Sequence, residues 1–332
     1  MKAAILTEKG IIVKNVPKPN ISNTDVLIRV KSVGICGTDI AIYKGTYKKN
    51  LPLILGHEFS GVVEEVGENV KNVSVGDRVT SEINISCGSC YYCSHGMPTH
   101  CLNRKAIGIS TDGAMAEYVK VPARNVHRLP DQIDFDDGTF VEPLAAAIET
   151  FIMSPIKENS CVVIYGSGKM GLLIAQVAKV YGAEKTIVID KVDWKLKLAK
   201  QLGVDVTINS QNENVKARVL EECNGVGADI VVEVTGSPSV FSKCFDIVKA
   251  RGTIALKSTH GVNTPINITD IVVRELKIQG SRCGPFEPAI ELLSSGEIKV
   301  KPLISKIFPI DETDEAFKAA MSPDTIKVII HP

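Results

Sequence analysis

The feature of the sequence that most constrains the fold is a group of four cysteines within fifteen residues. They follow the spacing Cys-x2-Cys-x2-Cys-x7-Cys and are Cys87, Cys90, Cys93 and Cys101. Four thiolates this close in sequence can complete a tetrahedral shell around one zinc ion, with no position left for another ligand. The alternative is a pair of disulfides, which an intracellular chain is not expected to keep. The spacing therefore predicts a loop, residues 86–102, organised by a structural zinc.

A second set of metal-ligand residue types lies upstream and is more widely spaced. It comprises Cys36, His57 and Glu58, with glycines beside both segments. Taken singly, such a cysteine or histidine is more often a packed core residue. Together, a mixed set drawn from separate segments can leave one coordination position open, as a catalytic metal requires. Asp39 is close enough in sequence to accept a hydrogen bond from a ligand histidine.

The overall composition is ordinary for a soluble globular protein. The chain has 332 residues, enough for two domains, and equal numbers of Lys plus Arg and Asp plus Glu, 38 each. This balance argues against nucleic acid and acidic membrane surfaces as partners. No apolar run is long enough to span a membrane, and the N-terminus reads as a strand without a signal-peptide pattern, so we expect a cytoplasmic protein. The remaining cysteines are interpreted as small buried apolar residues: Cys161, Cys223, Cys244 and Cys283.

The first 140 or so residues are rich in short segments that alternate between apolar and polar residues. Glycines and asparagines separate them, which is typical of strands joined by turns. The expected strands are 25–31, 61–67, 77–80 and 113–122. This pattern predicts an irregular β-barrel, with the four-cysteine loop as an excursion from it.

The pattern changes near Val141, where a helix over 144–154 is expected to lead into a second domain. A buried-type strand, 161–165, runs directly into a G-x-G-x-x-G turn, followed by an apolar helix over 172–181 and a strand over 185–190. The turn consists of Gly166, Ser167, Gly168, Lys169, Met170 and Gly171. Asp190 ends the next strand, nineteen residues after the last glycine. The strand–turn–helix context and the acidic residue together predict a dinucleotide-binding unit.

The alternation of strands and helices continues beyond Asp190. Expected strands cover 206–209, 228–234 and 253–257, and amphipathic segments cover 193–202 and 240–249. We therefore predict an α/β chain with a doubly wound parallel sheet. From about residue 277, a helix over 288–293 and further strands are expected to return to the first domain.

The predicted turn and Asp190 also indicate which cofactor is bound. Helix N-terminal amides favour the pyrophosphate, and the Asp190 carboxylate should accept hydrogen bonds from the adenosine ribose hydroxyls. That carboxylate would repel a 2′-phosphate, so NAD is favoured over NADP. Lys191, the next residue, keeps NADP open as an alternative.

Residues 34–39, 56–61 and 75–79, followed by the four-cysteine loop, resemble the zinc-dependent medium-chain dehydrogenases, most closely the sorbitol and threonine dehydrogenase branch. The resemblance covers essentially the whole chain. It implies a GroES-like catalytic domain, 1–142 and 277–332, and a Rossmann domain, 143–276. It also implies that Cys36, His57 and Glu58 bind the catalytic zinc. Glu142 stands where the alcohol dehydrogenases have a second cysteine, and is expected to bind directly or through water.

The same resemblance suggests roles for residues near the metal and the nucleotide. Thr38 matches the hydroxyl of the family's proton relay, whereas Ala41 stands where many relatives have a histidine. The relay must therefore end on water, the ribose or another group. Lys195 matches a position near the adenosine ribose, although a solvated lysine on an amphipathic helix is an equal alternative.

The leading hypothesis is a zinc- and NAD-dependent oxidoreductase. It would transfer a hydride from a secondary alcohol, such as a polyol, sugar or amino alcohol, to NAD and form a ketone. Two zinc ions per chain and a homodimer or homotetramer follow from the resemblance, since the family pairs its cofactor domains through an edge strand. An NADP-preferring aldose dehydrogenase of the same fold is the first alternative. A non-catalytic zinc-binding interaction protein, with one zinc, is the second.

Overall fold

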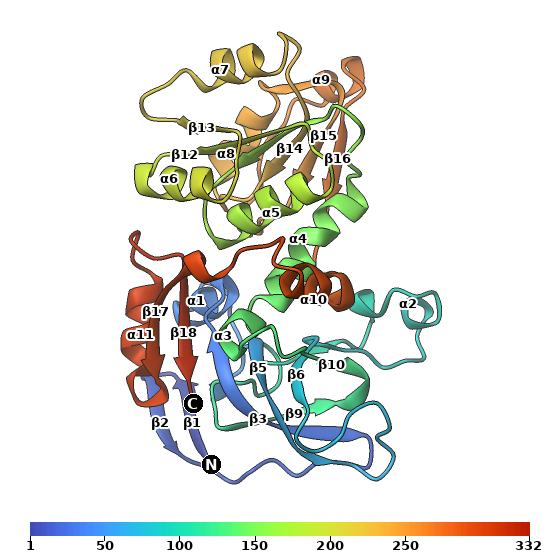
Figure 1. The fold of residues 1–332 in the computed structure, drawn as a ribbon, viewed down its shortest axis with the longest axis vertical. Coiled ribbons are helices and arrows are strands. Elements are labelled where there is room, and N and C mark those ends of the chain that lie inside the picture. The colour runs from blue at the N-terminus through green and yellow to red at the C-terminus, as the bar shows by residue number, and fades with distance from the viewer. The chain divides into compact units, whose positions relative to one another are not determined.

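The computed structural model describes residues 1–332, which form two compact units (Figure 1). The first unit consists of Met1–Glu142, Ile290–Ser294 and Val300–Pro332. The second consists of Pro143–Ala289 and Ser295–Lys299. None of the helices is both long enough and apolar enough to cross a membrane.

The first unit is built mainly from strands. Its largest sheet has the order β10 (Val126–Arg128), β6 (Arg78–Ser81), β5 (Glu58–Val66), β3 (Asp25–Gly34), β18 (Lys327–His331) and β17 (Ile304–Pro309), and β9 (Tyr118–Pro122) also pairs with β3. A second sheet has the order β2 (Gly10–Asn15), β1 (Lys2–Thr7) and β4 (Leu53–Ile54). The pair β7 (Asn84–Ile85) and β8 (Lys105–Ala106) brackets the four-cysteine loop. The apolar side chains of β1, β3 and β5 meet in one core.

Short helices connect the strands of the first unit. The α-helices are α1 (Gly37–Tyr43), α2 (Tyr91–Ser94), α3 (Phe135–Gly138) and α11 (Thr313–Ala320). The 3-10 turns are η1 (Pro98–His100), η2 (Ala123–Asn125), η3 (Lys301–Leu303) and η4 (Ile310–Glu312). Within the predicted strand 113–122, only Tyr118–Pro122 is a strand in the structure. The residues before it bond instead to the carbonyls of Ile54, Leu55 and Gly56.

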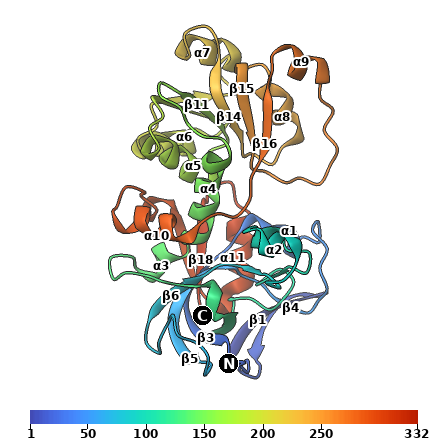
Figure 2. The ribbon, with the colours of Figure 1, turned by 90° about the vertical axis from the view of Figure 1, so that its right-hand side faces the viewer.

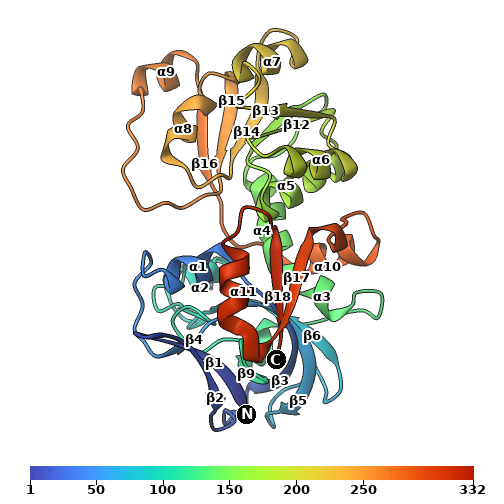
Figure 3. The ribbon, with the colours of Figure 1, turned by 90° about the vertical axis from the view of Figure 1, so that its left-hand side faces the viewer.

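The second unit contains a six-stranded parallel sheet. The strand order is β13 (Val206–Asn209), β12 (Lys185–Asp190), β11 (Cys161–Tyr165), β14 (Ala228–Glu233), β15 (Val248–Leu256) and β16 (Lys277–Gly280). Its helices are α5 (Lys169–Val180), α6 (Asp193–Gln201), α7 (Val215–Glu222), α8 (Pro238–Cys244) and α9 (Ile268–Val273). Figures 2 and 3 show α5 and α6 on one face of this sheet and α8 on the other. The predicted doubly wound fold is therefore confirmed.

The glycine-rich turn follows the central strand of this sheet. All five residues of β11 are buried, as expected for a strand covered on both faces. Gly166 has a φ of +111°, which favours glycine, and a Cβ on Gly171 would overlap with the Gly166 carbonyl oxygen. These two glycines let the chain turn sharply from β11 into α5.

Two predicted boundaries in the second unit differ from the structure. β16 pairs in parallel with β15, so residues 277–280 complete the second unit's sheet instead of returning to the first unit. The return begins at Ile290, inside α10 (Phe286–Ser294). The second difference concerns the amphipathic segment predicted over 240–249. α8 ends at Cys244, because the chain already forms β15 from Val248, which pairs with Ala228. A four-residue strand pattern does not specify which sheet it joins; hydrogen bonding to β15 decides it.

The four cysteines outside the predicted metal sites do not share one environment. Cys161 and Cys223 form a disulfide, with Cα atoms 6.4 Å apart, because the start of β11 lies beside the end of α7. Cys283 is partly exposed. The interpretation as small buried residues is therefore confirmed for Cys161 and Cys223, which are buried, and is wrong for Cys283. Cys244 is fully buried, and burial raises the pKa of its thiol.

Candidate functional site

The first candidate metal group lies at the ends of two paired strands. Cys36 follows β3, and His57 and Glu58 stand at the start of β5; Gly34 is directly opposite Glu58 in the antiparallel ladder. One ligand atom from each of Cys36, His57 and Glu58 lies within 4.8 Å of the others. His57 and Glu58 are 2% and 1% exposed. Sulfur, nitrogen and oxygen donors thus converge in a nearly dry position, which suits zinc.

Asp39 contacts both segments that carry this group. It is fully buried, and its Oδ2 accepts a hydrogen bond of 2.9 Å from the Cys36 amide. Its Oδ1 accepts one of 3.4 Å from the Gly56 amide and lies 3.3 Å from His57 Nδ1. Because Nδ1 faces this carboxylate, Nε2 is the His57 nitrogen left for a metal. Asp39 thus lies beside His57, and its support of a ligand histidine stays a prediction.

The electrostatics of the group also fit a cation. Burial lowers the pKa of His57, but the Asp39 carboxylate and then the Cys36 thiolate outweigh it and hold the pKa well above its usual value. His57 Nδ1 is buried without a well-aligned hydrogen bond. Without a metal, the negative groups therefore favour a proton on the ring. A divalent cation bound by the same groups would compete with that proton.

Glu142 and Thr38 occupy different surroundings from the three grouped ligands. Glu142 is the second residue of α4 (Val141–Met153) and is partly buried, but it does not belong to the group of mutually close ligand atoms. Direct binding by Glu142 is thus not supported by this arrangement, and an indirect role stays a prediction. Thr38 is the second residue of α1, two positions after Cys36, and Ala41 lies further along the same helix.

Sequence reasoning missed Lys327, which contacts this group. Its ammonium donates a hydrogen bond to Glu58 Oε2, and both side chains are buried. The only signal in the sequence is a lysine inside an otherwise apolar C-terminal segment, 326–330. That signal does not identify the partner, since the two residues are 269 positions apart.

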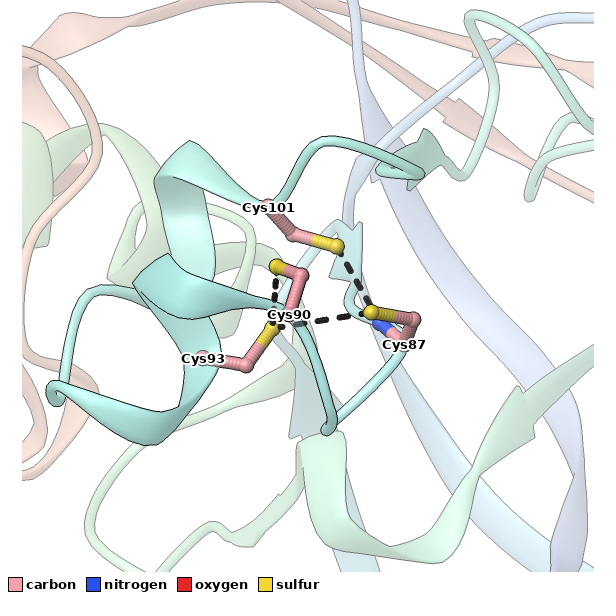
Figure 4. A group of neighbouring side chains, drawn as sticks. All are labelled: Cys87, Cys90, Cys93 and Cys101. Atoms are coloured by element: carbon pink, nitrogen blue, oxygen red, sulfur yellow. Dashed lines mark hydrogen bonds between the residues drawn. The ribbon is translucent and has the colours of Figure 1, made fainter.

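The second candidate metal group is the four-cysteine loop (Figure 4). Its four sulfur atoms all lie within 4.8 Å of one another. Cys90 Sγ is 3.5 Å and Cys87 Sγ is 4.0 Å from Cys93 Sγ. A tetrahedral zinc with Zn–S bonds near 2.3 Å requires sulfur separations of about 3.8 Å. The thiols therefore already have the spacing of a closed zinc shell.

Backbone amides in this loop prepare part of the shell for a metal. Hydrogen bonds from the Ser89 and Cys90 amides lower the pKa of Cys87 to about 5. Loss of solvent, together with the neighbouring Cys90, raises the pKa of Cys93 to about 11. One thiol is thus ready to bind as thiolate, whereas another needs a cation to drive its proton off.

The glycine-rich turn and Asp190 form the candidate nucleotide site in the second unit. Gly168 is exposed immediately before α5, and Lys169 and Met170, the first residues of that helix, are partly buried. Asp190 Oδ2 accepts hydrogen bonds from the Ser167 amide, 2.7 Å, and the Ser167 hydroxyl, 2.6 Å. Its Oδ1 accepts from the Lys191 and Val192 amides. These donors fix the position of the carboxyl group at the carboxyl end of β12.

Lys195 lies on α6, close in sequence to Asp190. Its ammonium is 5.4 Å from the centroid of the Trp194 ring, and the side chain is partly buried. This contact does not distinguish a nucleotide-binding lysine from one that lies along the surface of its helix.

Comparison with protein families gives two matches along the chain. Residues 22–131 match the alcohol dehydrogenase GroES-like domain, and residues 170–295 match the zinc-binding dehydrogenase domain. The first match contains both candidate metal groups apart from Glu142, and the second contains most of the glycine-rich turn's helix and Asp190.

Individual relatives match over nearly the whole chain. Sorbitol dehydrogenase of Halalkalibacterium halodurans is 36% identical, covering 100% of this chain and 99% of its own. L-threonine 3-dehydrogenase of Bacillus subtilis is 37% identical, with 97% and 95% covered. A crystal structure assigned to the zinc-binding dehydrogenases, from Sinorhizobium meliloti 1021 and bound to NADP, superimposes with a TM-score of 0.95 at 34% identity, with 100% and 99% covered.

Proposed function

The chain belongs to the zinc-binding, medium-chain dehydrogenases of the alcohol dehydrogenase type, and on that premise we propose that it oxidises a secondary alcohol to a ketone with NAD as the hydride acceptor. The observation that carries this proposal is the convergence of Cys36, His57 and Glu58 beside the buried Asp39. A metal-binding role alone would not require the dinucleotide turn and Asp190 that the same chain contains.

The side chains at the first metal group would have separate roles in the reaction. A zinc ion bound there supplies a Lewis acid that lowers the pKa of an alcohol oxygen. Cys36 and His57 would hold the metal, and Asp39 keeps the His57 ring oriented through Nδ1. Thr38 Oγ1 would accept the alcohol proton and pass it on. Ala41 offers no proton acceptor, so the next acceptor would be water, the ribose or another group.

The preference for NAD is argued from the charge at Asp190. Its carboxylate is fixed by four protein donors and can accept hydrogen bonds from ribose hydroxyls, whereas a 2′-phosphate would meet like charge. One observation favours the alternative, NADP: the relative from Sinorhizobium meliloti binds it. Lys191 beside Asp190 is also the type of residue that could pair with a phosphate.

Replacing Asp190 by serine should lower the ratio of NAD to NADP efficiency by at least about tenfold. The reason is that a charge-assisted hydrogen bond contributes about 1.5–3 kcal/mol, and its loss also removes the repulsion of a 2′-phosphate. Steady-state kinetics with both cofactors measure the ratio. Asp193→Ser, an exposed carboxylate on α6, is the matched control and should leave it unchanged. An unchanged ratio in Asp190→Ser would exclude Asp190 as the ribose ligand.

The substrate class is proposed from the relatives, which act on a polyol and on a hydroxy amino acid by name. The test is a panel of polyols, sugars, amino alcohols and simple secondary alcohols, each with NAD and with NADP, together with zinc analysis. We expect NADH formation with at least one member and two zinc ions per chain. One zinc per chain and no activity with either cofactor would instead support the non-catalytic zinc-binding protein.

We also propose that the protein assembles as a homodimer or homotetramer through the second unit. β16 is one of the two edge strands of its sheet, and α9 buries none of its residues. Ile268, Val272 and Val273 on that helix are each at least 67% exposed. An open edge strand beside exposed apolar side chains favours pairing with a second copy. Light scattering should give the mass of two or four chains, and a monomer would end the proposal.

A further inference from the structure

An oppositely charged pair lies in the interior of the first unit, at the edge of the first metal group. Lys327 is the first residue of β18 and is completely buried, and Glu58 is the first residue of β5. The Lys327 ammonium donates to Glu58 Oε2 and to the Thr139 carbonyl oxygen at 3.4 Å, and it lies 4.9 Å from the centroid of the Phe140 ring. A buried ammonium is costly unless paired, so this contact determines where the Glu58 carboxylate is held.

The path of the Lys327 side chain depends on a glycine. β3 lies between β18 and β5, and Gly34 pairs with Ile329 on one side and with Glu58 on the other. A Cβ on Gly34 would overlap with Nζ and Cε of Lys327 and lie 3.4 Å from Glu58 Oε2. Gly34 does not have a positive φ, so its backbone does not need glycine. What the site needs is the missing side chain, over which the lysine crosses the central strand to reach Glu58.

The Glu58 carboxylate can therefore interact with two cations. One is the Lys327 ammonium, and the other is the metal that Cys36, His57 and Glu58 can hold. A carboxylate that already neutralises an ammonium is a weaker donor to a metal than one that has no other cation. We propose that Lys327 is a positioning residue that shares Glu58 with the catalytic zinc, and so keeps Glu58 a weak, displaceable ligand. This inference rests on the proposed function. It extends that function by assigning the control of zinc affinity to a residue outside the ligand set.

The decisive variant is Lys327→Met, which keeps a long apolar side chain but removes the charge. Freed from the ammonium, Glu58 should bind zinc more strongly, and release of the catalytic zinc to a chelator should slow by about tenfold or more, the scale of outer partners' effects on metal affinity. The metal-free variant should melt below the metal-free wild type, because Glu58 is then a buried charge without its ammonium. Zinc should raise the melting temperature more in this variant than in the wild type.

A second variant separates position from charge. Gly34→Ala retains the lysine but places a methyl group where its ammonium lies, so the ammonium must move off Glu58. Zinc release should slow in the same direction as in Lys327→Met, and this variant keeps the proposal testable if the methionine variant does not fold. Lys306→Met, an exposed lysine on the neighbouring strand β17, is the control for a lost charge and should release zinc at the wild-type rate.

The direction of the change distinguishes sharing from a merely structural role. If Lys327 only supported the fold, its loss would loosen the site, and zinc would leave faster in both variants. If the wild type binds two zinc ions and the two variants release zinc faster than the wild type or at the same rate, this inference is overturned and the proposed function stays intact. A wild type that binds one zinc and shows no activity with either cofactor overturns both. Slower release in Lys327→Met and Gly34→Ala, with Lys306→Met unchanged, supports the sharing of Glu58.

Discussion

Cys36→Ala is expected to lose the catalytic zinc and, with it, alcohol-dependent NADH formation. Cys36 is the thiolate of a three-residue group whose other donors are one imidazole and one carboxylate, and the carboxylate is already paired with Lys327. Two neutral or weakened donors cannot replace a thiolate in holding zinc. Zinc analysis should fall from two ions per chain to one, and the ion retained by the four-cysteine loop serves as an internal control.

Glu142→Ala tests whether zinc loss is specific to the three residues whose ligand atoms lie close together. Glu142 lies outside the group of mutually close ligand atoms, so the variant should keep most of its zinc. Its turnover should still fall by about 10²-fold, because losing one group that shapes the surroundings of the reacting atoms has commonly that effect. Full activity would place Glu142 away from the reaction. Complete zinc loss, equal to that of Cys36→Ala, would make Glu142 a permanent ligand and contradict the indirect role predicted for it.

Cys93→Ser should produce the largest loss of stability. Cys93 lies 3.5 and 4.0 Å from two other sulfurs of the loop, so its replacement opens the closed shell. A structural zinc contributes folding free energy directly, and a loss of about 2 kcal/mol would lower the melting temperature by about 4–8 °C for a unit of this size. Thermal unfolding and zinc content measure the effect.

The matched control for Cys93→Ser is Ser94→Ala, the next residue of the same exposed helix, which offers no thiolate. It should keep two zinc ions and the wild-type melting temperature. Chelation of the loop zinc in the wild type should reproduce the behaviour of Cys93→Ser. Unchanged zinc content together with an unchanged melting temperature in Cys93→Ser would exclude the structural role.

The features that could be predicted from the sequence are those set by neighbouring residues. The spacing of the four cysteines limits how far apart their sulfurs can be, and the structure places them within 4.8 Å of one another. β11, the glycine-rich turn, α5 and β12 follow each other without interruption, so local turn geometry and apolar pattern were sufficient to predict this unit with Asp190 at the end of its second strand. The resemblance supplied the grouping of Cys36, His57 and Glu58.

The features that only the tertiary structure decided depend on which distant strands become neighbours. The order β18-β3-β5 places Lys327 beside Glu58, and only the absence of a side chain at Gly34 lets the two meet. The pairing of β16 with β15 assigns residues 277–280 to the second unit, and the fold brings Cys223, directly after α7, to Cys161 at the start of β11. The physical reason is the same in each case. A strand's own residues specify its faces, but its partners are chosen by hydrogen bonding and burial across the whole sheet.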